Sequence, residues 1–66
     1  MNIHDRYEEA RWERVTSISE IGLFQLALQE NLISEDEVEN SVYDLADVQN
    51  LIYDSSISDT QLEELT

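Results

Sequence analysis

Apolar residues recur along most of the chain at spacings of three and four, the period of an amphipathic helix. In the segment 18–30, the residues Ile21, Phe24 and Leu28 form one stripe. Two further apolar residues of the segment point well away from that stripe, Leu23 and Leu26. The apolar arc is therefore wider than a one-sided surface helix needs, and this helix is expected to lie at the centre of the fold.

A second apolar pattern runs through the following segment, at spacings of four, three, four and three. Its members are Val38, Val42, Leu45, Gln49 and Ile52. The pattern predicts one helix near residues 35–54. It is shorter than the three or four heptads that a coiled coil requires, so packing on the preceding helix within one subunit is favoured.

Helix-capping residues mark the expected boundaries. Ser34 with Glu37 reads as a capping box, and Ile33 and Val38 as its hydrophobic staple. The same pattern recurs farther along the chain, where Ser58 is the expected cap, Gln61 stands three positions later, and Ile57 pairs with Leu62.

Asn31 suits a left-handed residue that closes the preceding helix, with Leu32 folding back on Ala27 or Leu26. Asn2 with Asp5, and Ser17 with Glu20, offer weaker caps. The caps and the periodicity together predict an all-α fold, a small bundle of three to four helices in which the second and third form a central antiparallel hairpin. The expected helices lie near residues 3–15, 18–30, 35–54 and 59–65.

Composition agrees with a single acidic helical domain over residues 1–66. The chain has no proline and one glycine, so the turn signals of β-hairpins are missing. The glycine, Gly22, lies inside the second helix, where either a close backbone neighbour or simple tolerance accounts for it. The chain has no cysteine and one histidine, so we expect neither a disulfide framework nor a zinc site, and stability must come from packing.

Charge is the most unusual property of the sequence. There are 16 Asp and Glu against 3 Lys and Arg, for a formal net charge of −13. Four of the 16 carboxylates lie in the first helix together with all three arginines, which leaves 12 from Val15 onward with no Lys or Arg among them. Such a chain would be repelled by nucleic acid and by anionic membranes, so direct binding to either is excluded. Solubility alone remains a competing explanation, because added Asp and Glu are good solubilisers.

The acidic residues of the third predicted helix are expected to share the face opposite its apolar seam. At about 100° per residue, that face collects Asp36, Glu39, Asp44, Asp47 and Asp54, with Tyr43 among them. A continuous helix would spread them over about 27 Å, a length in which a DNA strand carries about eight phosphates. The face is therefore a candidate binding surface for a basic partner. Leu51 projects near it and either packs beneath the last helix, which we favour, or serves as an apolar anchor.

Trp12 is the other candidate contact. It projects opposite the face formed by Ile3, Tyr7 and Ala10, so one flat packing surface cannot bury all four. Either Trp12 is a hot-spot residue for a target or a second subunit, or it belongs to the core. A thin core without a metal or disulfide also leads us to expect a homodimer.

The sequence does not support a catalytic site. No Gly-rich phosphate loop, cysteine nucleophile or Ser/His/Asp arrangement is present, and no carboxylate pair stands out as an acid/base dyad. The segment beginning at Asp54 starts like a calcium loop, but its sixth position is Asp59 and its twelfth is Leu65. His4 is expected to be solvent-exposed. No enzymatic activity and no cofactor are expected, and the start of the chain lacks the features of a signal peptide.

In its size, its helical capping pattern, its lack of lysine and its carboxylate face, the chain resembles the small acidic inhibitors that phages and mobile elements encode, including anti-restriction and anti-CRISPR proteins. The resemblance implies an inhibitor in the cytoplasm of a bacterial host cell that occupies the basic DNA or RNA groove of a nucleic-acid-binding protein or ribonucleoprotein. The alternative is a helical adaptor or antitoxin-like regulatory module that binds a protein partner through an apolar patch around Trp12 and Leu51.

Overall fold

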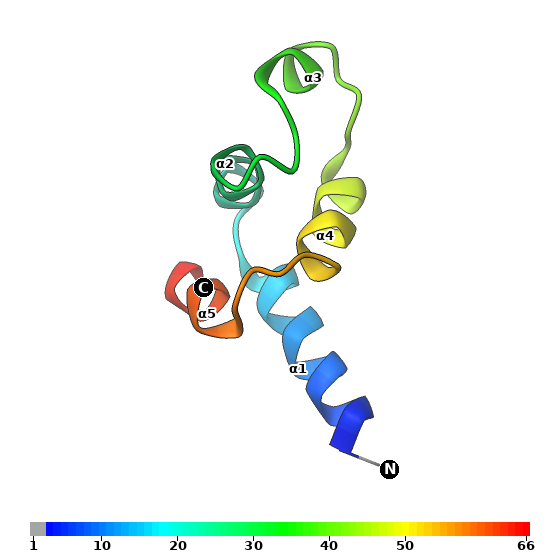
Figure 1. Cartoon of the computed structure of the whole chain (residues 1–66), viewed down its shortest axis with the longest axis vertical. Helices are drawn as coiled ribbons and strands as arrows, with labels where there is room; N and C mark the ends of the chain where they lie inside the picture. Colours follow the sequence, from blue (N-terminus) through cyan, green and yellow to red (C-terminus); the bar gives the residue numbers. More distant parts are fainter. Residues whose placement is uncertain (1–2) are drawn as a thin grey trace.

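The computed structural model describes the backbone of residues 3–66 and the side chains of residues 9–66, and this part of the chain is all-helical. The predicted all-α class is confirmed. Figure 1 shows the helices in order along the chain. They are α1 (Ile3–Ser17), α2 (Glu20–Gln29), α3 (Glu35–Glu39), α4 (Leu45–Tyr53) and α5 (Asp59–Leu65).

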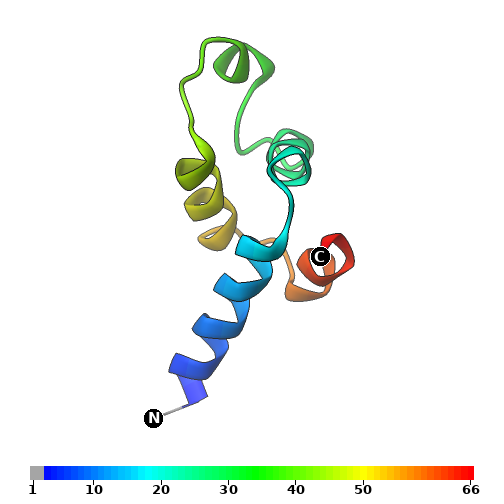
Figure 2. The ribbon, with the colours of Figure 1, turned by 180° about the vertical axis from the view of Figure 1, so that it is seen from behind.

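The helices are arranged around α4, which packs against α2 on one side and α1 on the other, while α5 packs against α1. The molecule measures 41 × 20 × 18 Å. Figures 1 and 2 show why it is elongated: α3 lies at one end, and the first half of α1 extends beyond the other helices at the opposite end. The body of the fold is therefore the second half of α1 with α2, α4 and α5.

The core is formed by apolar side chains from all four of these helices and from three connecting segments. Its fully buried members include Val15 on α1, Leu23 on α2, Ile52 on α4 and Leu62 on α5. Leu51 is half-buried and packs against this core, as favoured from the sequence.

The predicted end of α2 is confirmed. Asn31 adopts a left-handed conformation with φ of 60°. The backbone N–H of Leu32 donates to the carbonyl of Ala27 at 2.9 Å and that of Asn31 donates to Leu28 at 3.1 Å, which is a Schellman ending. The start of α2 differs from the prediction, because Ser19 and not Ser17 is the cap, and its hydroxyl accepts from the N–H of Gly22.

No backbone atom of another segment that the structure describes lies close to Gly22. A Cβ added there would lie 3.1 Å from the side chains of Ile18 and Ser19, the residues that lead into the same helix. The close backbone approach considered from the sequence is therefore absent at this position, and any crowding involves the cap itself.

The predicted single helix over 35–54 is wrong, because the chain leaves the helix after Glu39. Ser41 is left-handed with φ of 56°, and the N–H of Val42 donates to the carbonyl of Glu37 at 3.0 Å. This is a second Schellman ending, formed by a serine where glycine or asparagine is usual. A new helix, α4, then starts at its own cap, Asp44. The fold has five helices in the described chain where three to four were predicted.

Because of this break, the predicted central hairpin is not confirmed: the helix that directly follows α2 is not the one that packs against it. Residues Asn31–Ser34 join α2 to α3, but the helix that packs on α2 is α4. The cause is length: α3 has 5 residues and lacks a fully buried side chain, so it cannot supply the second half of a hairpin. Val48 and Ile52 of α4 provide that packing.

The two stronger predicted caps are present, whereas Asn2, the weaker cap expected before the first helix, lies outside the described residues. Ser34 and Glu37 form both hydrogen bonds of the capping box that begins α3. Ser58 caps α5 by accepting from the N–H of Gln61, with Ile57 and Leu62 both buried beside it. The side chain of Gln61 does not return to the cap but donates to Glu30, the C-cap of α2, at 3.0 Å.

Candidate protein-binding surface

The five predicted acidic residues are all exposed, but they do not lie on one continuous helix. Asp36 and Glu39 belong to α3, Asp44 and Asp47 to the start of α4, and Asp54 to its end. The 27 Å helical face expected from the sequence is therefore absent, because the helix ends between the second and third of them. Figure 1 shows α3 at one end of the molecule and α4 nearer its middle, so the helices that hold these residues are separate.

Asp44 and Asp47 have a structural role that the sequence interpretation missed. The carboxylate of Asp44 accepts from the N–H of Asp47 at 2.9 Å, and that of Asp47 accepts from the N–H of Asp44 at 3.2 Å. This capping box begins α4. Tyr43 before the cap and Val48 after it provided a sequence signal for this start, in the positions of a hydrophobic staple.

The remaining three acids have no such role. Within the described chain, no hydrogen bond or ion pair involves the side chains of Asp36, Glu39 or Asp54. Asp54 is the C-cap of α4, where a negative charge meets the negative end of the helix dipole. These three carboxylates are thus available to a partner at little or no cost to the fold.

Tyr43 is half-buried in the segment between α3 and α4, and its hydroxyl donates to Glu37 at 2.9 Å. This hydrogen bond, followed by those from Ser34, lowers the pKa of Glu37 below its ordinary value. The same bond raises the pKa of the Tyr43 hydroxyl. The pair holds the Tyr43 ring against the end of α3, so that hydroxyl is already engaged within the fold.

Replacing Tyr43 with phenylalanine should move the pKa of Glu37 back toward its ordinary value. A carboxylate with a lowered folded-state pKa stabilises the fold above its unfolded-state pKa, and that contribution is lost as the pH falls through the folded value. Acidification through and below the ordinary glutamate range should therefore loosen α3 in the wild type, and Tyr43→Phe should reduce this pH dependence.

The measurement is the side-chain carboxyl chemical shift of Glu37 as a function of pH. Val42→Ser, one position away, retains the tyrosine hydroxyl and should leave that titration unchanged. A Glu37 midpoint that is the same in wild type and Tyr43→Phe would contradict the assignment.

Trp12 lies on the outer side of α1 and is 38% exposed. Its ring meets that of Tyr53 edge to face, with the centroids 5.5 Å apart. Trp12 is therefore anchored by one edge to α4 and leaves part of the indole at the surface. The sequence predicted a face of Ile3, Tyr7 and Ala10 opposite Trp12. Of these residues, Ala10 is half-buried, and the side chains of Ile3 and Tyr7 lie outside the described ones.

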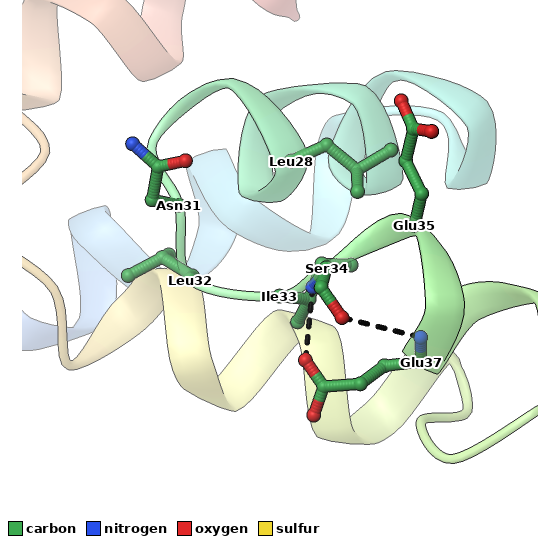
Figure 3. A pocket seen from close by; sticks show the side chains of 7 residues that line it. All are labelled: Leu28, Asn31, Leu32, Ile33, Ser34, Glu35 and Glu37. Atoms are coloured by element: carbon green, nitrogen blue, oxygen red, sulfur yellow. Dashed lines mark hydrogen bonds between the residues drawn. The ribbon is translucent and has the colours of Figure 1, made fainter.

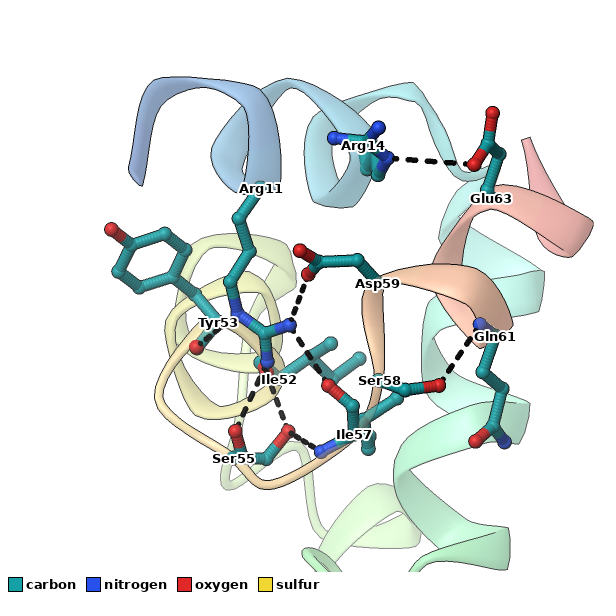
Figure 4. Close-up of polar contacts among 10 residues, drawn as sticks. All are labelled: Arg11, Arg14, Ile52, Tyr53, Ser55, Ile57, Ser58, Asp59, Gln61 and Glu63. Atoms are coloured by element: carbon teal, nitrogen blue, oxygen red, sulfur yellow. Dashed lines mark hydrogen bonds and ion pairs between the residues drawn. The ribbon is translucent and has the colours of Figure 1, made fainter. Parts of the chain in front are cut away.

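Arg11 has a position that was not foreseen from the sequence. It is 8% exposed and reaches from α1 into the turn between α4 and α5 (Figure 4). Its Nε donates to the carbonyl of Tyr53 at 2.8 Å, and Nη2 donates to those of Ile52 and Ser55 at 3.1 and 3.0 Å. Nη1 donates to the carbonyl of Ile57 at 2.8 Å and to the carboxylate of Asp59 at 2.7 Å.

These contacts use all five N–H donors of the guanidinium. They satisfy carbonyls at the end of α4, where unpaired acceptors gather, and they join the start of α5 to α1. The Tyr53 ring lies 5.9 Å from the guanidinium carbon, so it adds a cation–π contact. Arg11 is a structural residue and contributes little positive charge to the surface.

Burying Arg11 against Asp59 cancels one charge of each sign, so the excess of carboxylates on the surface stays as large as the composition implies. Arg14 is the remaining cation among the side chains of residues 9–66; it is half-buried and lies 3.9 Å from Glu63. From Val15 onward the chain has no other Lys or Arg. The described surface is thus suited to a partner of positive charge.

An apolar groove between α2 and α3 is the feature that the sequence interpretation misplaced. The stripe Ile21, Phe24 and Leu28 was assigned to a central helix, but Ile21 is 73% exposed and the other two are half-buried. Leu23, Leu26 and Ala27 form the inward face instead. With Val38 and Tyr43 on the opposite wall, the stripe lines a hollow of about 420 Å³, the α2–α3 groove.

A second hollow of about 430 Å³ also has Leu28 in its lining. Figure 3 shows Glu35 extending beside Leu28 and Glu37 folded back to Ser34. The groove thus has an apolar floor and carboxylates at its edge. Glu20, at the start of α2, adds another carboxylate to the lining of the first hollow.

The described residues contain no cluster of three or more His, Cys, Asp or Glu that could hold a metal ion. Nor does any helix within them have the length and apolar character needed to cross a bilayer. No protein-family model, curated protein or solved structure matches this chain. Function must therefore be inferred from the surface itself.

Proposed function

We propose that this chain is a non-enzymatic acidic binding protein that inhibits a nucleic-acid-binding protein or ribonucleoprotein by occupying its basic DNA or RNA groove. The observation that carries the proposal is the unmixed charge: 12 carboxylates and no Lys or Arg follow Val15, and Arg11 is turned inward. Self-repulsion among these carboxylates opposes folding, which a charge-dependent function would justify. A phage or mobile-element inhibitor of anti-restriction or anti-CRISPR type, acting in the bacterial cytoplasm, fits this description.

The carboxylates assigned to the target are Asp36, Glu39 and Asp54, supported by Asp44 and Asp47 at the start of α4. Within the described chain the side chains of the first three make no hydrogen bond or ion pair, so their carboxylates are available for binding. Basic side chains that normally hold phosphates would meet them. Direct binding to nucleic acid forms no part of the proposal, because phosphate and carboxylate repel each other.

The triple variant Asp36→Asn, Glu39→Gln, Asp54→Asn should weaken target binding by at least tenfold while the fold stays intact. Asp44 and Asp47 are left unchanged because their carboxylates cap α4. Removing a desolvated carboxylate from its arginine costs about 2–5 kcal/mol, much of it because the arginine is left unpaired, whereas a rim charge mainly affects association rate and salt dependence. The matched control Glu9→Gln, Glu13→Gln, Glu64→Gln removes the same charge from exposed positions on α1 and α5.

Binding is measured against partners recovered from a bacterial lysate with the tagged full-length chain, at low and high salt and with competing duplex DNA or RNA. The proposal is abandoned if the partners lack a basic groove, or if saturating nucleic acid leaves the complex intact. Equal losses in the triple variant and its control would show that overall charge, and not these three positions, governs affinity.

The alternative, a helical adaptor or antitoxin-like module, is favoured by the exposed apolar side chains. Trp12 retains an exposed edge, whereas Leu51, the other half of the apolar patch considered from the sequence, packs against the core. In the adaptor function Trp12→Ala would abolish partner binding and the triple acidic variant would have little effect. The two candidate functions therefore rank the same variants in opposite order.

A further inference from the structure

We infer that the α2–α3 groove is a docking site for a basic amphipathic helix of a protein partner. The groove consists of the stripe Ile21, Phe24 and Leu28 on α2, facing Val38 and Tyr43. Each of these side chains retains exposed apolar surface, and Ile21 is exposed to 73%. The choice of a basic occupant rests on the proposed function, while the position of the groove does not.

The groove is not a gap in the core. The inward face of α2 is already complete, since Leu23 and Ala27 are fully buried. The apolar stripe lies beside that face: Phe24 and Leu28 pack against the core with part of their surface, and Ile21 is exposed. Covering Ile21 in a complex would remove apolar surface from water without repacking the fold.

The opposite wall of the groove is held in place by polar contacts. The capping box of Ser34 and Glu37 fixes the start of α3, and the hydroxyl of Tyr43 donates to Glu37. In the described chain α3 makes none of the three principal helix–helix contacts. Its position supports the shape of the groove more than it supports the core.

Charge selects the occupant. Glu20 lines the first hollow, and Glu35 and Glu37 line the second. A second copy of this chain would bring another net charge of −13 to a surface that already repels it. An uncharged apolar segment would cover the carboxylates of Glu20 and Glu35 without pairing them, which is costly. The carboxylate of Glu37 already accepts from Ser34 and Tyr43 within the fold. A partner with lysine or arginine beside its apolar anchors is attracted to the acidic surface and pairs the carboxylates of Glu20 and Glu35.

The dimensions favour a helix as the element that docks. From Ile21 to Leu28 the stripe rises about 10 Å, which is two turns of helix. A facing helix presents anchors at i, i+3 or i+4 and i+7 over the same distance. Leu28 is common to both hollows, so anchors on successive turns can reach each of them.

The test uses the full-length chain labelled with ¹⁵N and three synthetic helical peptides of 15 residues. The first peptide carries leucine on one face of its helix and lysine on the opposite face. The second peptide has serine in place of leucine, and the third has glutamine in place of lysine. The first peptide should shift the amide signals of residues 20–28 and 38–43 and bind more tightly than either of the others. Ile21→Ser should weaken it by about tenfold or more, and Leu65→Ser, which removes an exposed apolar side chain from α5, should not.

Four results would overturn the docking site: no binding of the leucine–lysine peptide, equal binding of the serine peptide, equal binding of the glutamine peptide, or equal binding to Ile21→Ser. Groove signals that shift with protein concentration alone would assign the site to a second copy instead. If the serine peptide binds equally and the shifts lie at Asp36, Glu39 and Asp54, the docking site fails while the proposed function stands. If the leucine–lysine peptide binds in the groove but nucleic acid does not compete with the target, the proposed function fails while the docking site stands.

Discussion

Arg11→Ala should lower the free energy of unfolding by about 3–5 kcal/mol, the usual cost of removing one partner from a buried ion pair. The substitution leaves four backbone carbonyls and the Asp59 carboxylate without the guanidinium that satisfies them. A domain of this size has a total stability of about 3–10 kcal/mol, so the variant should be largely unfolded at moderate temperature. Urea denaturation followed by circular dichroism measures the change.

Arg11→Lys is the informative companion, because it retains the charge and the stem but loses the planar five-donor fork. It should fold and be less stable than the wild type by a smaller amount than the alanine variant. Arg14→Ala is the matched control on the same helix. Its partner Glu63 is 3.9 Å away and largely exposed, so the change should be within about 1 kcal/mol. Wild-type stability in Arg11→Lys would show that charge alone holds the turn.

Leu62→Ala should cost about 2–5 kcal/mol, because it removes a fully buried side chain from the core. Leu62 is the residue through which α5 reaches the buried cluster, beside Ile57 in the staple that begins this helix. Truncation leaves a cavity that a short helix cannot close without losing its position on α1. The urea midpoint should fall with an unchanged slope.

Leu65→Ala, three residues farther along α5, is the control for this change. Leu65 is 44% exposed, and its truncation should alter stability by about 0.5 kcal/mol or less. Similar losses in the two variants would mean that α5 is attached by its whole length and not by the side chain of Leu62.

The parts of the fold that follow from local chemistry could be predicted from the sequence. Ser34, Ser58 and Asn31 each act within a few residues of their own position, and all three occur at the helix ends where they were expected. The break after Glu39 could not be found in this way, because the apolar spacing continues through it and Ser41 is an uncommon left-handed residue. The box of Asp44 and Asp47 was the available signal, and its second aspartate departs from the usual Glu or Gln.

The sequence predicted that the acidic residues of the candidate surface are exposed to solvent, but it did not predict their positions relative to one another. Acids opposite an apolar seam should face solvent, and the five predicted acids are exposed. Their relative positions depended on one continuous helix, which Ser41 interrupts. Arg11 was beyond local reasoning altogether, because its partners are 41 to 48 residues away and four of its five acceptors are backbone carbonyls.

The contacts of Arg11 also lead us to expect that the helices it joins open together and that α3 opens separately. Helices α1, α4 and α5 share one guanidinium, so none of them can open without exposing the same buried charge, and their amide protons should exchange with solvent through a common event. Helix α3 is outside this group of helices and is held mainly by its cap and by Tyr43. Its amides should exchange sooner and through a local opening. The α2–α3 groove therefore has one wall that can adjust to an occupant while the rest of the molecule stays folded.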